Sequence, residues 1–231
     1  MTVREAAELA LVESCIKFDP EEKTVKFSYP YIKDISRLQN NYLQVVAMEA
    51  GVEKRLHKWG RRTEYDDEMQ GYLERGAFVK LTQQEIDEWT GPVNYISHHG
   101  VVKETSSTIK LRIVSNSSLN NNNQGLSLND CLPKGPNSLV PLMEALNTWR
   151  SYPEVVTWDY VKCYNSVLTS EKDMHLRRFV WRFEGEKDWS IYAINKMHFG
   201  DRPAAIGLDV AKKIVAEAGR DIDSAAANMI H

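Results

Sequence analysis

The chain has 231 residues, of which 42% are hydrophobic and 10% aromatic, so it can bury a sizeable core as one large domain or two small ones. Its 29 basic and 32 acidic side chains give a formal net charge of −3, so the overall positive charge common in nucleic-acid-binding domains is absent. No stretch approaches the roughly 20 apolar residues of a membrane span, and the N-terminus lacks the apolar run of a signal peptide. We therefore expect an intracellular protein, cytoplasmic or nuclear, without a membrane partner.

The first 92 residues have mainly helical patterns. Apolar residues at helical spacing predict a short helix over 3–15 and a long amphipathic helix that contains Val45, Met48, Val52, Leu56 and Trp59. A third helix is predicted from about 64 to 75, where Gly76 provides a natural stop. Between the first two helices, alternation of apolar and polar residues predicts a half-buried strand over 24–29.

Beyond Gly91 and Pro92 the patterns become mixed. Strands are expected over 95–103 and 108–114, then over 155–159, 178–181 and 189–194, with helices over 139–149, 203–218 and 221–230. The sequence has no glycine-rich dinucleotide motif and no phosphate-binding loop of the Walker type. We therefore predict an α+β fold in two parts, a helical lead-in over 1–92 and a mixed region over 93–231.

Asp159 is the first candidate for chemistry, because it follows a short apolar run and precedes the aromatic ring of Tyr164 by five residues. Carboxylates fixed at a sheet edge can bind the Mg²⁺ ions of two-metal phosphoryl transfer. A ring close to such a site can reject a ribose 2′-hydroxyl. On its own, however, the pattern also fits an aspartate that merely ends a strand.

Other segments give this pattern a context. Ser127-Leu128-Asn129-Asp130-Cys131-Leu132 with Lys134-Gly135-Pro136 resembles the Leu-Asn-Asp signature of Pao/BEL retrotransposon reverse transcriptases. Segments 95–103, 110–114 and 198–204 are similar to that family's His-His strand, its Lys-x-Arg-Ile-Val strand and its Phe-Gly-x-x-Pro-Ala segment (motif B). Asp159 stands where the family has motif A. Each match is weak to moderate alone, but five of them occur in family order.

The resemblance implies a right-hand polymerase fold, with fingers and part of the palm. It implies that Asp159 is the catalytic and metal-binding carboxylate and Tyr164 the steric gate. The nucleotide-binding residues would be Lys110, Arg112, Tyr160, Tyr164, Phe199 and Gly200, with Mg²⁺ as cofactor and with a template-primer and a deoxynucleoside triphosphate as partners. Asp159 is then expected at a strand end, with Arg112 facing it across a cleft.

One departure limits the expected activity. The family takes two further carboxylates from a Tyr-x-Asp-Asp hairpin (motif C), and no such motif follows Asp159 in this sequence. Tyr65-Asp66-Asp67 precedes Asp159 and falls in a predicted helix, so we interpret it as unrelated to catalysis. We expect either a catalytically incomplete fragment of an RNA-directed DNA polymerase or a non-enzymatic binding or structural protein derived from one. Because a palm without this hairpin leaves an open sheet edge, a homo-oligomer is also expected.

Overall fold

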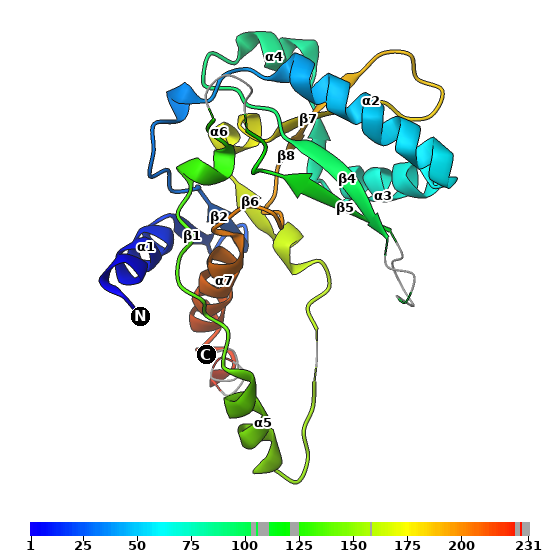
Figure 1. Cartoon of the computed structure of the whole chain (residues 1–231). Helices are drawn as coiled ribbons and strands as arrows, with labels where there is room; N and C mark the ends of the chain where they lie inside the picture. Colours follow the sequence, from blue (N-terminus) through cyan, green and yellow to red (C-terminus); the bar gives the residue numbers. More distant parts are fainter. Residues whose placement is uncertain (103–104, 106–110, 121–124, 158, 225–226, 228–231) are drawn as a thin grey trace.

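The computed structural model of the protein describes residues 1–102, 105, 111–120, 125–157, 159–224 and 227, and it has the mixed α+β composition predicted from the sequence (Figure 1). Its α-helices are α1 (Val3–Ser14), α2 (Tyr42–Trp59), α3 (Arg62–Glu74), α4 (Gln83–Glu88), α5 (Leu142–Arg150), α6 (Glu171–His175) and α7 (Ala204–Ala218). Short 3₁₀ turns lie at η1 (Ile35–Arg37), η2 (Leu128–Cys131) and η3 (Cys163–Ser166).

The described strands form three small sheets. Strand β1 (Ile16–Asp19) is antiparallel to β2 (Thr24–Phe27), which pairs in parallel with β6 (Val167–Thr169). Strand β8 (Ser190–Ile194) lies between β3 (Phe78–Lys80) and β7 (Arg178–Trp181), antiparallel to both. Strands β4 (Ser97–Val102) and β5 (Leu111–Asn116) form a hairpin. Two of these sheets combine strands from both sides of residue 92, so the ranges 1–92 and 93–231 share their sheets.

Local sequence signals account for most of these elements. Helix α1 begins at Thr2, whose side chain accepts from the backbone N–H of Glu5 while the Glu5 carboxylate accepts from that of Thr2. Helices α2, α3 and α7 and strands β2, β4, β5, β7 and β8 form where apolar periodicity predicts them. The helix expected over 221–230 lies largely outside the described residues.

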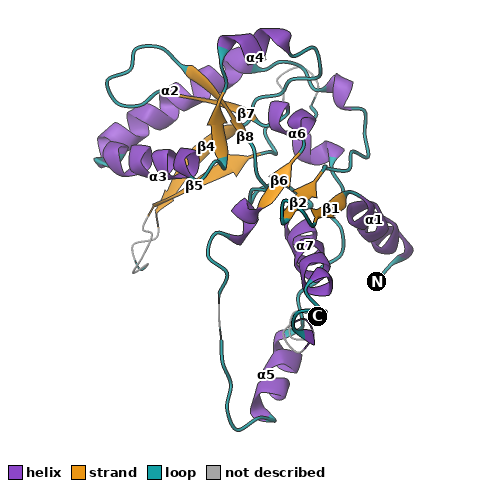
Figure 2. Cartoon of the chain, turned by 180° about the vertical axis from the view of Figure 1, so that it is seen from behind, coloured by secondary structure: helices purple, strands orange, loops and turns teal. Residues whose placement is uncertain are grey.

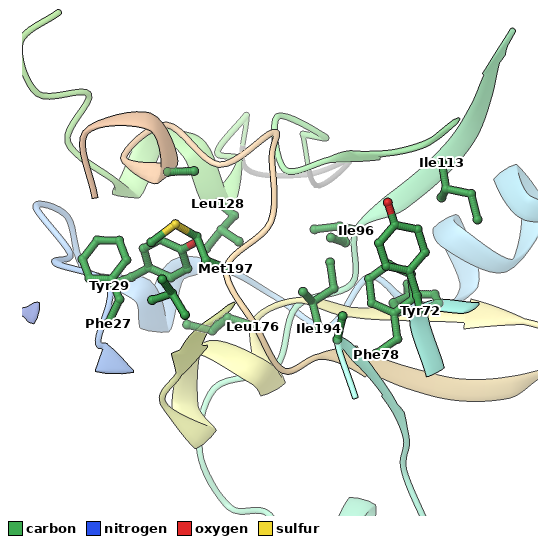
Figure 3. Close-up of a cluster of buried hydrophobic side chains, with 14 of the residues drawn as sticks. Phe27, Tyr29, Tyr72, Phe78, Ile96, Ile113, Leu128, Leu176, Ile194 and Met197 are labelled. Carbon is green, nitrogen blue, oxygen red and sulfur yellow. The ribbon is translucent and has the colours of Figure 1, made fainter. Parts of the chain in front are cut away.

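A continuous apolar core joins the sheets. In Figure 3, Phe27, Leu176 and Met197 lie at one end of a buried cluster, while Tyr72 and Phe78 lie at the other. The rings of Tyr72 and Phe78 stack with centroids 4.5 Å apart. Helix α3 is thereby fixed against the sheet formed by β3, β8 and β7, and it also contacts β5.

One prediction from the sequence is wrong. The described residues of 155–159 form no strand; they belong to an exposed arm, the described residues of 139–161, that carries α5 (Figures 1 and 2). Helix α5 has no buried residue and extends away from the other elements. The physical reason is pairing: β6 takes the edge of β2, and within the described chain no strand bonds to the backbone of 155–157. An apolar run without a partner strand leaves its N–H and C=O groups to water.

Candidate functional site

A tight turn between β8 and α7 carries two of the predicted nucleotide-binding residues, Phe199 and Gly200. Gly200 has φ +113°, a conformation that L side chains rarely adopt. A Cβ atom there would lie only 2.8 Å from the carbonyl oxygen of Ser115, at the end of β5. Glycine is therefore required both by the backbone conformation and by the close approach of β5.

Asn129, in the segment that resembles the Leu-Asn-Asp signature, holds this turn. Its Nδ2 donates to the carbonyl oxygen of Gly200 at 2.9 Å and to Oγ of Ser118 at 2.8 Å, and its Oδ1 accepts from the backbone N–H of Arg202 at 2.9 Å. Asn129 is 5% exposed, so water does not compete for these bonds. One side chain thus joins the turn after β5, the 3₁₀ turn η2 and the turn before α7.

Asp201 also holds this turn, although the sequence patterns indicated no role for it. Its Oδ2 accepts from the Tyr29 hydroxyl at 2.8 Å and from Nη1 of the fully buried Arg177 at 3.2 Å. The Ser117 hydroxyl donates to the other carboxylate oxygen. Burial, together with the neighbouring Asp201 carboxylate, raises the pKa of Tyr29 far above its usual range, so its phenol stays protonated. The sequence shows Arg177 and Asp201 but does not indicate that the two side chains pair.

Tyr164, the predicted steric gate, lies beside this turn. It is half-buried in η3, and its ring centroid is 6.3 Å from that of Phe199, with the ring planes at 76°. Phe199 also contacts the ring of His198, with centroids 4.1 Å apart. Burial lowers the pKa of His198 to about 4, so the ring is neutral and its Nδ1 donates to the Phe199 carbonyl at 2.8 Å. The structure therefore brings Tyr164, Phe199 and Gly200 together.

Asp159 and Tyr160 are placed differently from the expectation. Both are exposed in the arm, and the described residues directly before Asp159, 155–157, form no strand. Among the described residues, no hydrogen bond or ion pair connects Asp159 to Arg112 or to any other side chain. The strand that was expected to fix the carboxylate is missing, so its position is set only by the loop that leads to η3.

Arg112 is exposed on β5 opposite Val101, while Lys110 lies outside the described residues. Strand β5 contacts α3, and the positive charges of Arg75 and Arg112 both act to lower the pKa of Tyr72 in α3. The net effect on that pKa is still a rise to about 12, because burial dominates. Arg112 is thus close enough to α3 to add to the positive potential there.

The residues present do not form a Mg²⁺ site. Mg²⁺ in proteins is bound by several oxygen ligands in octahedral geometry, and Asp159 supplies one carboxylate. In the part of the chain that the structure describes, no three His, Cys, Asp or Glu side chains are grouped closely enough to hold a metal ion.

The structure also shows what two further sequence features do, the Tyr-Asp-Asp triplet at 65–67 and the first histidine of the His-His strand. Tyr65-Asp66-Asp67 lies in α3 as predicted, and Asp66 accepts from Nε of Arg62 at 3.0 Å and from Nε1 of Trp181 at 2.9 Å. His98 is buried, and its Nδ1 lies 2.6 Å from the Tyr65 hydroxyl. Both side chains therefore hold α3 against the sheets.

Comparison with known proteins adds no identification: no family model matches the chain, and a search of curated proteins finds no match. None of the helices in the described ranges is long and apolar enough to span a membrane.

Replacing Gly200 with alanine is expected to lower the free energy of unfolding by about 2–4 kcal/mol, through backbone strain and the close contact with Ser115. Urea unfolding followed by circular dichroism measures the change. Gly185→Ala is the matched control, because Gly185 has φ +90° but open space around its Cβ position. We expect a loss of about 1 kcal/mol there. Equal losses in both variants would contradict the contact with Ser115.

Proposed function

We propose that this chain is part of an RNA-directed DNA polymerase similar to the Pao/BEL reverse transcriptases, contributing fingers and the first part of the palm, and that it is catalytically incomplete alone. The observation that carries the proposal is the junction at Asn129. The segments that resemble the family's Leu-Asn-Asp signature and its motif B, and the turn that follows the strand similar to its Lys-x-Arg-Ile-Val strand, are joined by the hydrogen bonds of one buried amide. Matches that were independent in the sequence are thus adjacent in space.

In this proposal Tyr164 and Phe199 form the floor of a deoxynucleotide site. Their rings meet edge to face, which leaves the Tyr164 ring able to exclude a 2′-hydroxyl from the sugar position. Arg112, with Lys110, would meet the triphosphate from β5, and Asp159 would contribute one oxygen ligand to Mg²⁺. The template-primer and the deoxynucleoside triphosphate are the proposed partners.

Competition binding with a fluorescent deoxynucleoside triphosphate tests the proposed sugar pocket. The chain is expected to bind the deoxynucleotide more tightly than the matching ribonucleotide, and Tyr164→Ala is expected to remove that preference. Phe18→Ala is a control for loss of a partly buried ring elsewhere in the structure. A wild-type chain without a sugar preference would contradict the assignment of Tyr164.

No primer extension is expected from the chain alone, because one carboxylate cannot position two metal ions for in-line displacement. The assay uses an RNA template, a DNA primer and either Mg²⁺ or Mn²⁺. Template-directed incorporation that disappears in Asp159→Asn would overturn this prediction and would mean that another carboxylate completes the site. Asp221 and Asp223, which follow α7 in the sequence, would be substituted first.

A second candidate function is a non-enzymatic binding or structural protein derived from such an element. The observation that favours it is the first part of the arm, residues 139–156, whose exposed apolar side chains have no function in the proposed nucleotide site. In that case the arm is the surface that binds a partner, and self-association of the chain is the property to measure.

A further inference from the structure

Helix α5 has an apolar face that the described chain does not bury. Leu142, Ala145 and Trp149 recur at the spacing of one helical face, yet none of the nine residues of α5 is buried. Leu142 is 72% exposed and Trp149 is 48% exposed. A helix this short is marginal in water unless its apolar face packs on something. We therefore looked for a surface that could receive it.

An open groove of about 1540 Å³ lies between this face of α5 and helix α7. Ala145 and Trp149 line it from α5, Ala205 and Leu208 line it from α7, and the segment 134–140 also contributes. A nine-residue helix with its side chains is about 13.5 Å long and 10–12 Å wide, which is a volume of roughly 1100–1500 Å³. The groove is therefore large enough for one further helix of the length of α5.

The groove and the arm have net charges of opposite sign. The charged residues that line the groove are five basic and three acidic side chains: Arg4, Lys134, Arg202, Lys212, Lys213, Glu5, Glu8 and Asp209. The arm has three acidic side chains and one basic side chain: Glu144, Glu154, Asp159 and Arg150. Opposite charges attract two surfaces and fix their register. An arm from a second copy thus suits the groove in charge as well as in size.

We infer that α5 of a second copy of this chain docks in the groove between α5 and α7, so that two chains exchange arms about a twofold axis. Such an interface uses the same arm and the same groove twice, so it closes as a dimer and does not grow into a filament. The arm's large apolar residues up to the end of α5 are 48% to 80% exposed: Leu139, Val140, Leu142, Met143 and Trp149. Burying them in two grooves, together with the groove walls, removes on the order of 1500 Å² from water, the size of a standard stable interface.

The inference goes beyond the proposed function, because it names the surface of the second copy that receives the arm and requires no nucleotide. Tyr164 also lines the groove, so a docked arm and the proposed sugar pocket would share that ring. The association is therefore measured without nucleotide, with molecular mass as the readout. A failure of this test leaves the proposed polymerase function untouched, and a failure of that function leaves this test untouched.

Ala205→Trp tests the groove from the side of α7, because Ala205 is exposed and lines the groove, and a tryptophan there would fill it. The dissociation constant of the full-chain dimer, measured by sedimentation velocity over a range of concentrations, is expected to rise about tenfold or more. Ala218→Trp is the matched control, since it places the same side chain on an exposed alanine of the same helix outside the groove. This control should associate like the wild type.

A mixing experiment separates docking of an arm in a groove from packing of one arm on another. The double variant Leu142→Ser with Met143→Ser keeps the groove, and Ala205→Trp keeps the arm. An equimolar mixture is expected to form a mixed dimer at a concentration where each variant alone is monomeric, which also shows that both are folded.

Ala205→Trp that associates like the wild type would mean that the arms pack on each other and would overturn the inference. A mixture that stays monomeric, or an equal loss of association in Ala218→Trp, would overturn it too. So would a wild-type chain that stays monomeric at high concentration, with α5 folded back on its own α7.

Discussion

Glu49→Gln is expected to stabilise the folded chain by about 2–4 kcal/mol at pH 8 and to leave its stability almost unchanged at pH 4.5. Glu49 is fully buried in α2, and its Oε1 accepts from the backbone N–H of His98 at 2.9 Å. Burial raises the pKa of this carboxyl from 4.5 to about 8, against the smaller opposing effects of the His98 hydrogen bond and of Arg55. Near pH 7 the folded protein therefore holds Glu49 protonated.

The direction of the pH dependence follows from the two pKa values. Below pH 4.5 the carboxyl is protonated in both the folded and the unfolded chain, so it costs nothing. Between pH 4.5 and 8 the unfolded chain ionises and the folded chain does not, so stability falls as the pH rises. At about 1.4 kcal/mol per pKa unit the full penalty approaches roughly 5 kcal/mol, and relaxation around the charge reduces it. Glutamine resembles the protonated form and removes the ionisation.

Urea unfolding of wild type and variant at several pH values measures this difference. His98, whose pKa burial lowers to about 4, titrates in both proteins, so its contribution largely cancels. Glu53→Gln is the control on the same helix, because ion pairs with Arg182 and Arg62 lower the pKa of Glu53. It should lose stability relative to the wild type as the pH rises. A Glu49→Gln variant that is no more stable at pH 8 than at pH 4.5, relative to wild type, would contradict a neutral buried Glu49.

The second large effect concerns the exposed arm. We expect the chain to self-associate at micromolar concentration through residues 139–161, and Leu142→Ser with Met143→Ser to shift it towards the monomer. The arm exposes large apolar side chains by 45% to 88%: Leu139, Val140, Leu142, Met143, Trp149, Tyr152, Val155, Val156, Tyr160 and Val161. Covering a few hundred Å² of such surface contributes several kcal/mol, at about 25 cal/mol per Å².

Light scattering coupled to size-exclusion chromatography measures the mass. The helix itself supports the expectation, because an isolated nine-residue helix such as α5 is marginal in water without packing. Leu43→Ser is the matched control, since Leu43 is 79% exposed on α2 and lies outside the arm. A wild-type chain that stays monomeric at high concentration would show that the arm is solvated as it stands.

The sequence predicted those elements whose signals are local. The cap at Thr2 and the apolar periodicity of 42–59 depend only on residues within a turn or two, so α1 and α2 could be predicted. Local signals alone could not decide whether residues 155–159 form a strand. Its apolar run fits a strand, but a strand forms only where another strand accepts its hydrogen bonds, and pairing is decided by the rest of the chain.

The same distinction between local signals and tertiary pairing applies to the candidate site. Tyr164, Phe199 and Gly200 were predicted from motifs, and they lie together. The contacts that hold them were not predictable, because they depend on folding: Asn129 bonds Gly200 across 71 residues and Asp201 bonds Tyr29 across 172.

We propose that the turn at Gly200, together with Tyr164 and Asp159, belongs to a nucleotide-polymerising site. The most direct measurement is primer extension by the chain extended into the coding sequence that follows the codon for His231. If that sequence encodes a Tyr-x-Asp-Asp motif, we expect the extended protein to copy an RNA template into DNA. Asp159→Asn should abolish the reaction, and Tyr164→Ala should admit ribonucleotides. Extension that is indifferent to Asp159→Asn would contradict the proposed function.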